Sequence, residues 1–286
     1  MGCTETVVLD ELRICYVADI RDLASLQSVE TGNRMDYSGY TFYRISNDRF
    51  RYFYEIMEND EVVAVLKYGL YADSMAEQVF VYYRVNNHIL YDRDRLARLL
   101  NLPESLGMLF NNFTSLDLAY DSSLNLVSII RRMMRDKSVT TIINGKAIKD
   151  RKALLTGVTF EFSTSLNRMR HPTITVKQKK AISNKNEGIT VQCYDKKAEI
   201  VNHSGKYYIM DYYDNPKRLY RLEVRLHYQE LKDYFSGKGI IPSIDVLCES
   251  EQLKDMFLYH LSSVIRFSRS RNKVQWKALL RCSDGG

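Results

Sequence analysis

The chain lacks the features that mark small secreted, zinc-ribbon or membrane proteins. Only five cysteines occur in 286 residues, and no two form a CxxC pair, which argues against a disulfide framework and a zinc ribbon. No run of 18 apolar residues is present, and the N-terminus lacks the basic-then-apolar order of a secretory signal. Repeats and low-complexity segments are also missing. We therefore expect a globular, cytoplasmic protein that does not associate with membranes.

Charge is distributed unevenly along the chain. The formal net charge of +6 is too small a surplus to name a partner. Residues 131–197, however, carry 16 basic and 5 acidic side chains, whereas residues 1–130 carry 11 basic and 19 acidic ones. A basic segment that follows an acidic one favours a local surface for a polyanion over a uniformly cationic protein.

The order of predicted elements indicates an α+β fold. Residues 7–17 and four segments between residues 40 and 85 have the β-branched and aromatic composition of strands, with Asn, Asp and Ser at the turns. We expect an antiparallel meander there. Leucines at helical spacing then predict a helix from Asp92 that Pro103 stops, and a second short helix at residues 104–110.

Strands and helices both follow in the second half. Further strands are expected at residues 113–121, 157–162, 173–176, 189–194 and 219–228, and helices after Ser123, at 229–235 and over 246–268. Together these elements predict an antiparallel β-sheet core with flanking helices.

Two of the predicted strands carry acids in positions where strands rarely have them. In LDLAYD, alternation puts Asp117, Ala119 and Asp121 on one face and Leu116, Leu118 and Tyr120 on the other. In RLEVRLH, Glu223 shares its face with Arg221 and Arg225. One interpretation is a network of salt bridges within the sheet. The other is a metal site, because two carboxylates on separate strands are the oxygen ligands that Mg²⁺ or Mn²⁺ prefers.

A third segment, CYDKKAE, places Tyr194 just before Lys196 and Lys197, with Glu199 beyond them. The tyrosine can be structural and the lysines can form a solvated face. In a phosphoryl-transfer site, by contrast, a tyrosine oxygen can attack a phosphodiester when a cation neutralises the developing charge.

These three segments, FTSLDLAYD, VQCYDKKAE and YRLEVRLHYQELKDY, occur in the order of three motifs of a known group of proteins. They resemble the core motifs of replication initiation proteins that start rolling-circle DNA synthesis, namely the replication initiation factor family of plasmids and the gene II proteins of filamentous phages. The resemblance is anchored on residues 113–235. The His-hydrophobic-His motif of the wider HUH endonuclease superfamily is absent, and Ser115 replaces a basic residue that often precedes the first motif.

The resemblance implies a divergent HUH-like fold and a role for each matching residue. Tyr194 would be the nucleophile and Lys196 the cation at the phosphate, although Lys197 also satisfies a Y-x-x-K spacing. Asp117 and Glu223 would hold Mg²⁺ or Mn²⁺, and Glu199 would be a third ligand or would orient Lys196. The expected reaction nicks origin DNA and leaves a 5′-phosphotyrosyl link and a free 3′-hydroxyl primer.

The expected partner is single-stranded or hairpin origin DNA, with a host helicase and polymerase acting afterwards and a homodimer as a possible assembly. The residues expected to bind DNA are Lys177, Lys179, Lys180, Lys185, Arg221, Arg225, Arg269 and Arg271. Trp276 could add a stacking ring to the basic tail, or the tail could be an ordinary amphipathic helix end.

Two alternatives stay open beside this interpretation: a mobilisation relaxase, and a non-catalytic DNA-binding regulator that keeps the fold. For the organisation of the chain we expect a catalytic and DNA-binding domain over residues 1–235. A C-terminal helical segment with a basic tail would then occupy residues 236–286.

Overall fold

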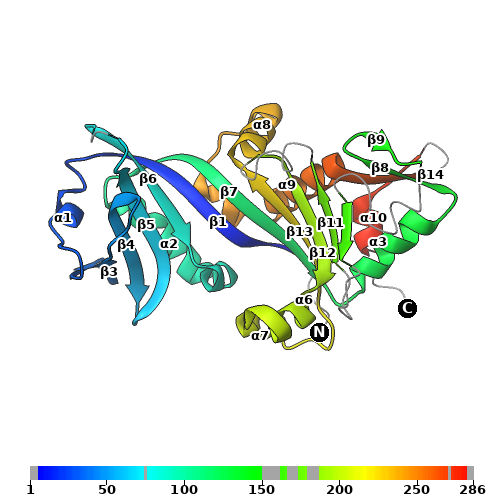
Figure 1. Ribbon diagram of the computed structural model, residues 1–286, viewed down its shortest axis with the longest axis horizontal. Helices are drawn as coiled ribbons and strands as arrows, with labels where there is room; N and C mark the ends of the chain where they lie inside the picture. The colour runs from blue at the N-terminus through cyan, green and yellow to red at the C-terminus, as the bar shows by residue number, and fades with distance from the viewer. Residues whose placement is uncertain are drawn as a thin grey trace. The chain divides into compact units, whose positions relative to one another are not determined.

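The computed structural model describes residues 6–73, 76–149, 162–165, 173–178, 187–269 and 272–281 (Figure 1). The chain divides into two compact units. Unit 1 comprises residues 1–8, 117–238 and 249–286, and unit 2 comprises residues 9–116 and 239–248. The C-terminal residues 249–286 therefore group with the second half of the chain, and residues 239–248 group with the first half.

Unit 2 is a meander with helices on one face of its sheet. The strand order is β7-β1-β6-β5-β4-β3-β2, and neighbours from β1 to β2 run antiparallel. Its elements are β1 (Val7–Asp19), α1 (Ala24–Gln27), β2 (Arg34–Tyr37), β3 (Tyr40–Arg44), β4 (Phe50–Glu58), β5 (Glu61–Leu70), β6 (Gln78–Val85), η1 (Asn87–Tyr91), α2 (Arg93–Ser105), the first part of β7 (Leu109–Ser122) and η3 (Ile244–Cys248). The predicted meander is confirmed.

Turn residues in the sequence explain the tight hairpins of unit 2. Between β4 and β5, Asn59 and Asp60 both have positive φ values, of 51° and 62°, and Glu58 pairs directly with Glu61. Two-residue hairpins need this left-handed conformation, which Asn and Asp tolerate better than most residues. Along the two strands of this hairpin, every second side chain points into the core.

Pro103 does not end helix α2, because a tertiary contact compensates for the hydrogen bond that proline cannot make. The helix continues to Ser105, and β7 begins at Leu109, so the expected second helix at residues 104–110 does not form. A proline leaves the carbonyl four residues earlier without its helical donor. Here the hydroxyl of Tyr83 donates a hydrogen bond of 3.0 Å to that carbonyl, at Leu99.

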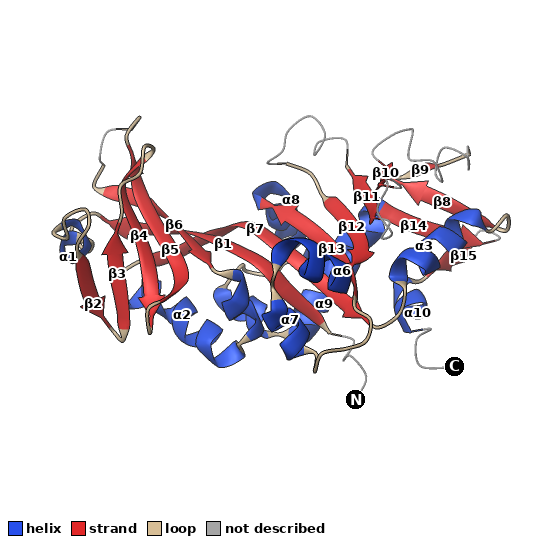
Figure 2. Cartoon of the chain, turned by 60° about the horizontal axis from the view of Figure 1, so that its bottom comes forward, coloured by secondary structure: helices blue, strands red, loops and turns tan. Residues whose placement is uncertain are grey.

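Unit 1 combines a main sheet, a small second sheet and helices. The orders are β10-β11-β12-β13-β7 and β15-β14-β8-β9. Its elements are the end of β7, α3 (Leu126–Arg135), β8 (Val139–Ile143), β9 (Lys146–Ala147), β10 (Phe162–Ser165), β11 (Thr173–Lys177), β12 (Thr190–Asp195), α6 (Lys196–Glu199), η2 (Ile200–Ser204), α7 (Tyr207–Tyr212), β13 (Tyr220–His227), α8 (Tyr228–Lys238), α9 (Ser250–Val264), β14 (Ile265–Arg269), β15 (Asn272–Val274) and α10 (Trp276–Arg281). Figure 2 shows helices and strands in separate colours.

One face of the main sheet in unit 1 is hydrocarbon. Cys193 on β12, and Leu222 and Val224 on β13, are buried, and helices α3 and α9 contact both strands. Burial of such side chains contributes about 1.5–3 kcal/mol each and fixes which face of β12 and β13 points inwards. Because strand residues alternate, Tyr194 and Glu223 must project from the opposite face.

The described structure departs from expectation in the last third of the chain. Residues 265–268, expected in a helix, belong to β14 (Ile265–Arg269), because Ile265 and Phe267 are buried where β14 pairs with β8. The α+β class with antiparallel sheet is confirmed. None of the described helices has the length and hydropathy needed to cross a membrane.

Candidate active site

The register of two strands brings the predicted site residues onto one face of unit 1. On β12 and β13, Tyr194 lies opposite Arg221, and Gln192 lies opposite Glu223. Tyr194 and Glu223 are therefore diagonal neighbours, within reach of each other for long side chains. Asp117 and Asp121 reach the same group from β7, on the other side of β13.

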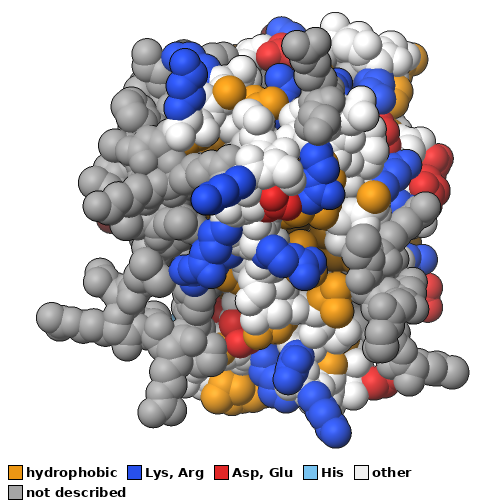
Figure 3. All heavy atoms as spheres, turned by 90° about the vertical axis from the view of Figure 1, so that its right-hand side faces the viewer, with side chains coloured by type: hydrophobic (Ala, Val, Ile, Leu, Met, Phe, Trp, Pro, Cys, Tyr) orange, Lys and Arg blue, Asp and Glu red, His pale blue; other side chains and the backbone are white. Residues whose placement is uncertain are grey.

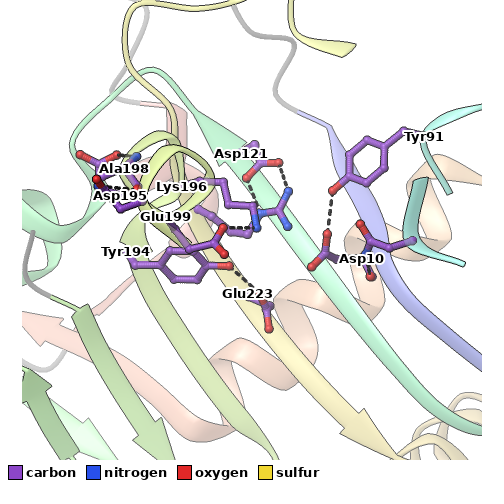
Figure 4. A network of polar contacts seen from close by, with 12 residues as sticks. Asp10, Tyr91, Asp121, Tyr194, Asp195, Lys196, Ala198, Glu199 and Glu223 are labelled. Carbon is purple, nitrogen blue, oxygen red and sulfur yellow. Dashed lines mark hydrogen bonds and ion pairs between the residues drawn. The ribbon is translucent and has the colours of Figure 1, made fainter. Parts of the chain in front are cut away.

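Tyr194 contacts one of the two predicted acids directly. Its hydroxyl donates a hydrogen bond of 2.9 Å to Oε2 of Glu223 (Figure 4). Glu223 is buried, whereas Tyr194 is partly exposed. The phenol therefore lies at the surface of the site, with a carboxylate behind its oxygen that can accept the phenolic proton.

Arg225 joins the second predicted acid to the first. Its Nε lies 3.0 and 2.9 Å from the two carboxylate oxygens of Asp117, and its Nη2 lies 2.6 Å from Oδ2 of Asp117. The same Nη2 is 3.6 Å from Oε1 of Glu223. The guanidinium of Arg225 thus compensates the negative charge of both carboxylates. The two acids are buried, whereas the side chain of Arg225 is 45% exposed.

The donor set suits a divalent ion in its chemistry, since Mg²⁺ is often held by two carboxylates together with substrate phosphate oxygens. Among the described residues, no cluster of three or more His, Cys, Asp or Glu side chains that could hold a metal ion is present. The guanidinium of Arg225 lies where Asp117 and Glu223 converge. The two acids can therefore bind a metal ion together only when the side chain of Arg225 moves away from them.

The two lysines after Tyr194 have different surroundings. Nζ of Lys196 is buried, lies 2.8 Å from Oε2 of Glu199 and 5.6 Å from the ring centroid of Tyr194. Nζ of Lys197 instead donates a hydrogen bond of 2.9 Å to the carbonyl of Pro216. Lys196 is therefore the lysine beside the phenol, and Glu199 orients it.

A short helix fixes this lysine in place. Asp195 caps α6 by accepting a hydrogen bond of 2.9 Å from the backbone N–H of Ala198. The cap turns the chain directly after β12, which brings Lys196 back over the ring of Tyr194. We did not predict this helix, although an Asp before KKAE is a recognisable N-cap signal.

Arg221 and Asp121 form a second ion pair, which is more deeply buried than the pair of Arg225 and Asp117. Both side chains are fully buried, and two hydrogen bonds of 2.8 and 2.6 Å join the guanidinium to the carboxylate. Arg221 was expected to bind DNA. With no exposed surface it cannot touch a DNA backbone in this structure, and it instead pairs with an acid that lies 100 positions away in the sequence.

The other predicted DNA contacts are only partly within the described structure. Lys177 and Arg269 are exposed, and Arg269 forms an ion pair of 2.8 Å with Asp136. The remaining expected contacts lie outside the described residues: Lys179, Lys180, Lys185 and Arg271. Trp276 is buried, with Nε1 bonded to the carbonyl of Ile265 at 2.9 Å, so its ring is not available for base stacking.

Basic side chains are spread over one side of unit 1 (Figure 3). Figure 3 shows the face towards α3, β8 and β14, where Lys and Arg side chains are spread between smaller numbers of acidic ones. Exposed cations at the end of α3 and beyond it include Arg132, Arg135 and Lys137. This agrees with the basic composition of residues 131–197.

No family model matches the chain, and no curated protein matches it.

Proposed function

We propose that the chain is a metal-dependent DNA nicking enzyme that initiates rolling-circle replication, with Tyr194 as its nucleophile. The observation that supports this most directly is the 2.9 Å hydrogen bond from Tyr194 to Glu223, in a group that also contains Asp117. These three residues come from the three separate segments that resemble the initiator motifs. Their convergence is what the proposed chemistry requires.

In the proposed reaction, the phenol oxygen of Tyr194 attacks the phosphorus of a phosphodiester in single-stranded DNA. The phenolic proton passes to Oε2 of Glu223, which already accepts it in a hydrogen bond. The new oxygen–phosphorus bond forms as the bond to the 3′ oxygen breaks, and the 3′ oxygen takes a proton from water. The products are a 5′-phosphotyrosyl link and a free 3′-hydroxyl, which a polymerase can extend.

Charge in the site favours this step. The buried ammonium of Lys196 lies near the phenol ring and lowers the cost of negative charge on the phenol oxygen and on the phosphate. Asp117 and Glu223 are the residues that would hold Mg²⁺ or Mn²⁺, and such an ion polarises phosphate oxygens. Oε1 of Glu223 lies 3.6 Å from Nη2 of Arg225, whereas Oε2 accepts the hydrogen bond from the phenol.

Covalent capture on DNA tests the proposal. The protein is incubated with Mg²⁺ or Mn²⁺ and a library of single-stranded oligonucleotides with a random central region, and covalent adducts are isolated under denaturing conditions. We expect an adduct whose mass places a 5′-phosphate on Tyr194, and a short common sequence among the captured strands. The captured sequence can then be placed in a supercoiled plasmid to measure nicking.

Two variants make the result specific. Tyr194→Phe removes only the attacking oxygen and should give no adduct. Tyr220→Phe makes the same change on the neighbouring strand at a position opposite Asp195, on the other face of the sheet, and should react as the unaltered protein does. Adduct formation by Tyr194→Phe would exclude Tyr194 as the nucleophile, and specific binding without any adduct would favour a non-catalytic regulator.

A further inference from the structure

The sheet of unit 2 exposes a face on which basic and aromatic side chains alternate. In register across β4, β5 and β6, Phe53 lies beside Lys67 and Lys67 beside Tyr82. In the next row, Arg84 of β6 lies beside Arg13 of β1. Opposed residues in an antiparallel sheet project from the same face, so these five side chains form one surface.

Helices α1 and α2 contact these strands on the opposite face. Tyr54 and Tyr83, which alternate with Phe53 and Tyr82, point to that side, and their hydroxyls donate hydrogen bonds to the carbonyls of Leu26 in α1 and Leu99 in α2. The basic and aromatic face is by contrast open, since Arg13 and Arg84 are exposed. Phe80, two positions before Tyr82 on β6, is 58% exposed.

A hollow of about 250 Å³ lies in this face. Three cations reach it from three different strands, namely Arg13, Lys67 and Arg84, and Phe53 and Tyr82 contribute aromatic walls. Nζ of Lys67 lies 4.9 Å from the ring centroid of Phe50 and 5.9 Å from that of Phe53, so the ammonium is held between rings. The hollow therefore offers positive charge and flat apolar surface side by side.

The cations in the hollow repel one another. Burial lowers the pKa of Lys67, and the positive charges of Arg13, Arg84 and Arg49 lower it further. Acidic groups nearby are Glu11, which pairs with Arg13, and Glu55, which faces the same side from β4. An anion bound among Lys67, Arg84 and Arg13 would relieve this repulsion, and arginine and lysine are side chains that proteins commonly use to bind phosphate.

We propose that this face of unit 2 binds single-stranded DNA, with backbone phosphates at Lys67, Arg84 and Arg13 and bases stacked on Tyr82 and Phe80. A groove of cations that follows the backbone, next to exposed rings that stack on bases, is the arrangement that proteins use for single strands. A duplex would present only its phosphates, because its bases are already stacked. The site lies in a different unit from Tyr194 and is independent of the nicking reaction.

A charge reversal on the proposed surface tests the site. Arg84→Glu and a matched reversal, Arg93→Glu in the exposed first turn of α2, are each placed in a Tyr194→Phe background that cannot cleave. Binding of labelled (dT)20 is followed by fluorescence anisotropy between about 50 and 300 mM salt. We expect Arg84→Glu to weaken binding about tenfold and to reduce the salt slope by about 0.7, the value for one lost phosphate contact on a single strand.

The control should stay within about twofold of the parent protein, since reversal of one charge far from a contact changes only the long-range field. Equal losses in both variants would overturn the site. If Arg84→Glu weakens the binding of a 20-base-pair duplex or of rU20 as much as it weakens the binding of (dT)20, the assignment to single-stranded DNA is overturned. Circular dichroism of both variants confirms that each is folded.

Photochemical crosslinking locates the strand without any substitution on the surface. (dT)20 with 5-iododeoxyuridine in place of thymidine is irradiated in complex with the Tyr194→Phe protein, and crosslinked peptides are identified by mass spectrometry. We expect crosslinks at Phe80, Tyr82 or Phe53. Crosslinks confined to residues 117–238 and 249–286 would overturn the proposal.

Discussion

Tyr194 and Glu223 lie on adjacent strands and are joined by a hydrogen bond of 2.9 Å from phenol to carboxylate. If Glu223 accepts the phenolic proton during attack, Glu223→Gln keeps the shape of the site and loses the base. We expect the single-turnover cleavage rate to fall about 100-fold or more, the usual effect of losing a general base. Affinity for the oligonucleotide should stay within a few-fold, which anisotropy measures in parallel.

The matched control for Glu223→Gln is Glu104→Gln, the same change at an exposed position of α2 in unit 2. It should cleave at the unaltered rate. A Glu223→Gln variant that cleaves normally would show that Glu223 neither takes the proton nor holds a metal.

Arg225 blocks the place where Asp117 and Glu223 converge, so its removal should expose a metal site. We expect Arg225→Gln to bind Mn²⁺ at least tenfold more tightly than the unaltered protein, because two carboxylates lose their resident cation. Titration followed by electron paramagnetic resonance of free Mn²⁺ measures this. The double variant Asp117→Asn, Arg225→Gln should lose the gain, and equal Mn²⁺ affinity in all three proteins would contradict the assignment of the two acids.

The buried pair of Arg221 and Asp121 should matter for stability far more than an exposed one. Asp121→Ala leaves a buried guanidinium without its counter-charge, and we expect a loss of about 3–5 kcal/mol in the free energy of unfolding. Arg269→Ala removes one partner of the exposed pair with Asp136 and should cost less than about 1 kcal/mol. Urea denaturation compares the two, and similar losses would mean that the buried pair contributes little beyond an ordinary surface contact.

His260 on α9 should make stability depend on pH. Burial lowers the pKa of this imidazole from 6.5 to about 4. The rings of Tyr234 and Tyr259 contact the imidazole, and the ion pair of Lys238 and Asp255 lies beside Tyr234. The unfolded chain therefore takes up a proton below about pH 6.5 while the folded protein does not. This contribution to stability is complete above pH 6.5 and is lost as the pH falls to about 4, by up to about 3 kcal/mol.

Urea unfolding at several pH values tests the histidine. His260→Phe should flatten the pH dependence between about 6.5 and 4, whereas replacement of the exposed His203 by Gln should leave it unchanged. A His260→Phe protein with the same pH dependence as its parent would assign the loss to the carboxylates.

The face that carries the site could be predicted from the sequence, but the partners within it could not. Alternation alone placed Asp117 and Asp121 together, and Glu223 together with Arg225, because a strand has a period of two. Which arginine meets which acid depends on the register between β7 and β13, which no local pattern encodes. Arg221 and Arg225 look equivalent in RLEVRLH, yet one is fully buried and the other is 45% exposed.

Long-range contacts also explain the other differences. Pro103 stays inside α2 because Tyr83 supplies the missing donor, and residues 265–269 form a strand because β8 pairs with them. The basic face of unit 2 was not predicted either, since residues 1–130 are acidic overall. A meander sorts side chains by face, so a segment with a negative total can still present a positive surface.

Cys193 can serve as a chemical probe of β12, the strand that carries Tyr194. Burial raises the pKa of this thiol, which therefore reacts slowly with alkylating reagents while the protein is folded. Because Cys193 and Tyr194 are consecutive on β12, any opening that admits a reagent to the thiol must loosen the packing around the strand that holds the phenol, including its contacts with α3 and α9. The alkylation rate of Cys193, followed peptide by peptide in the presence and absence of DNA, thus measures how firmly substrate clamps the reacting strand.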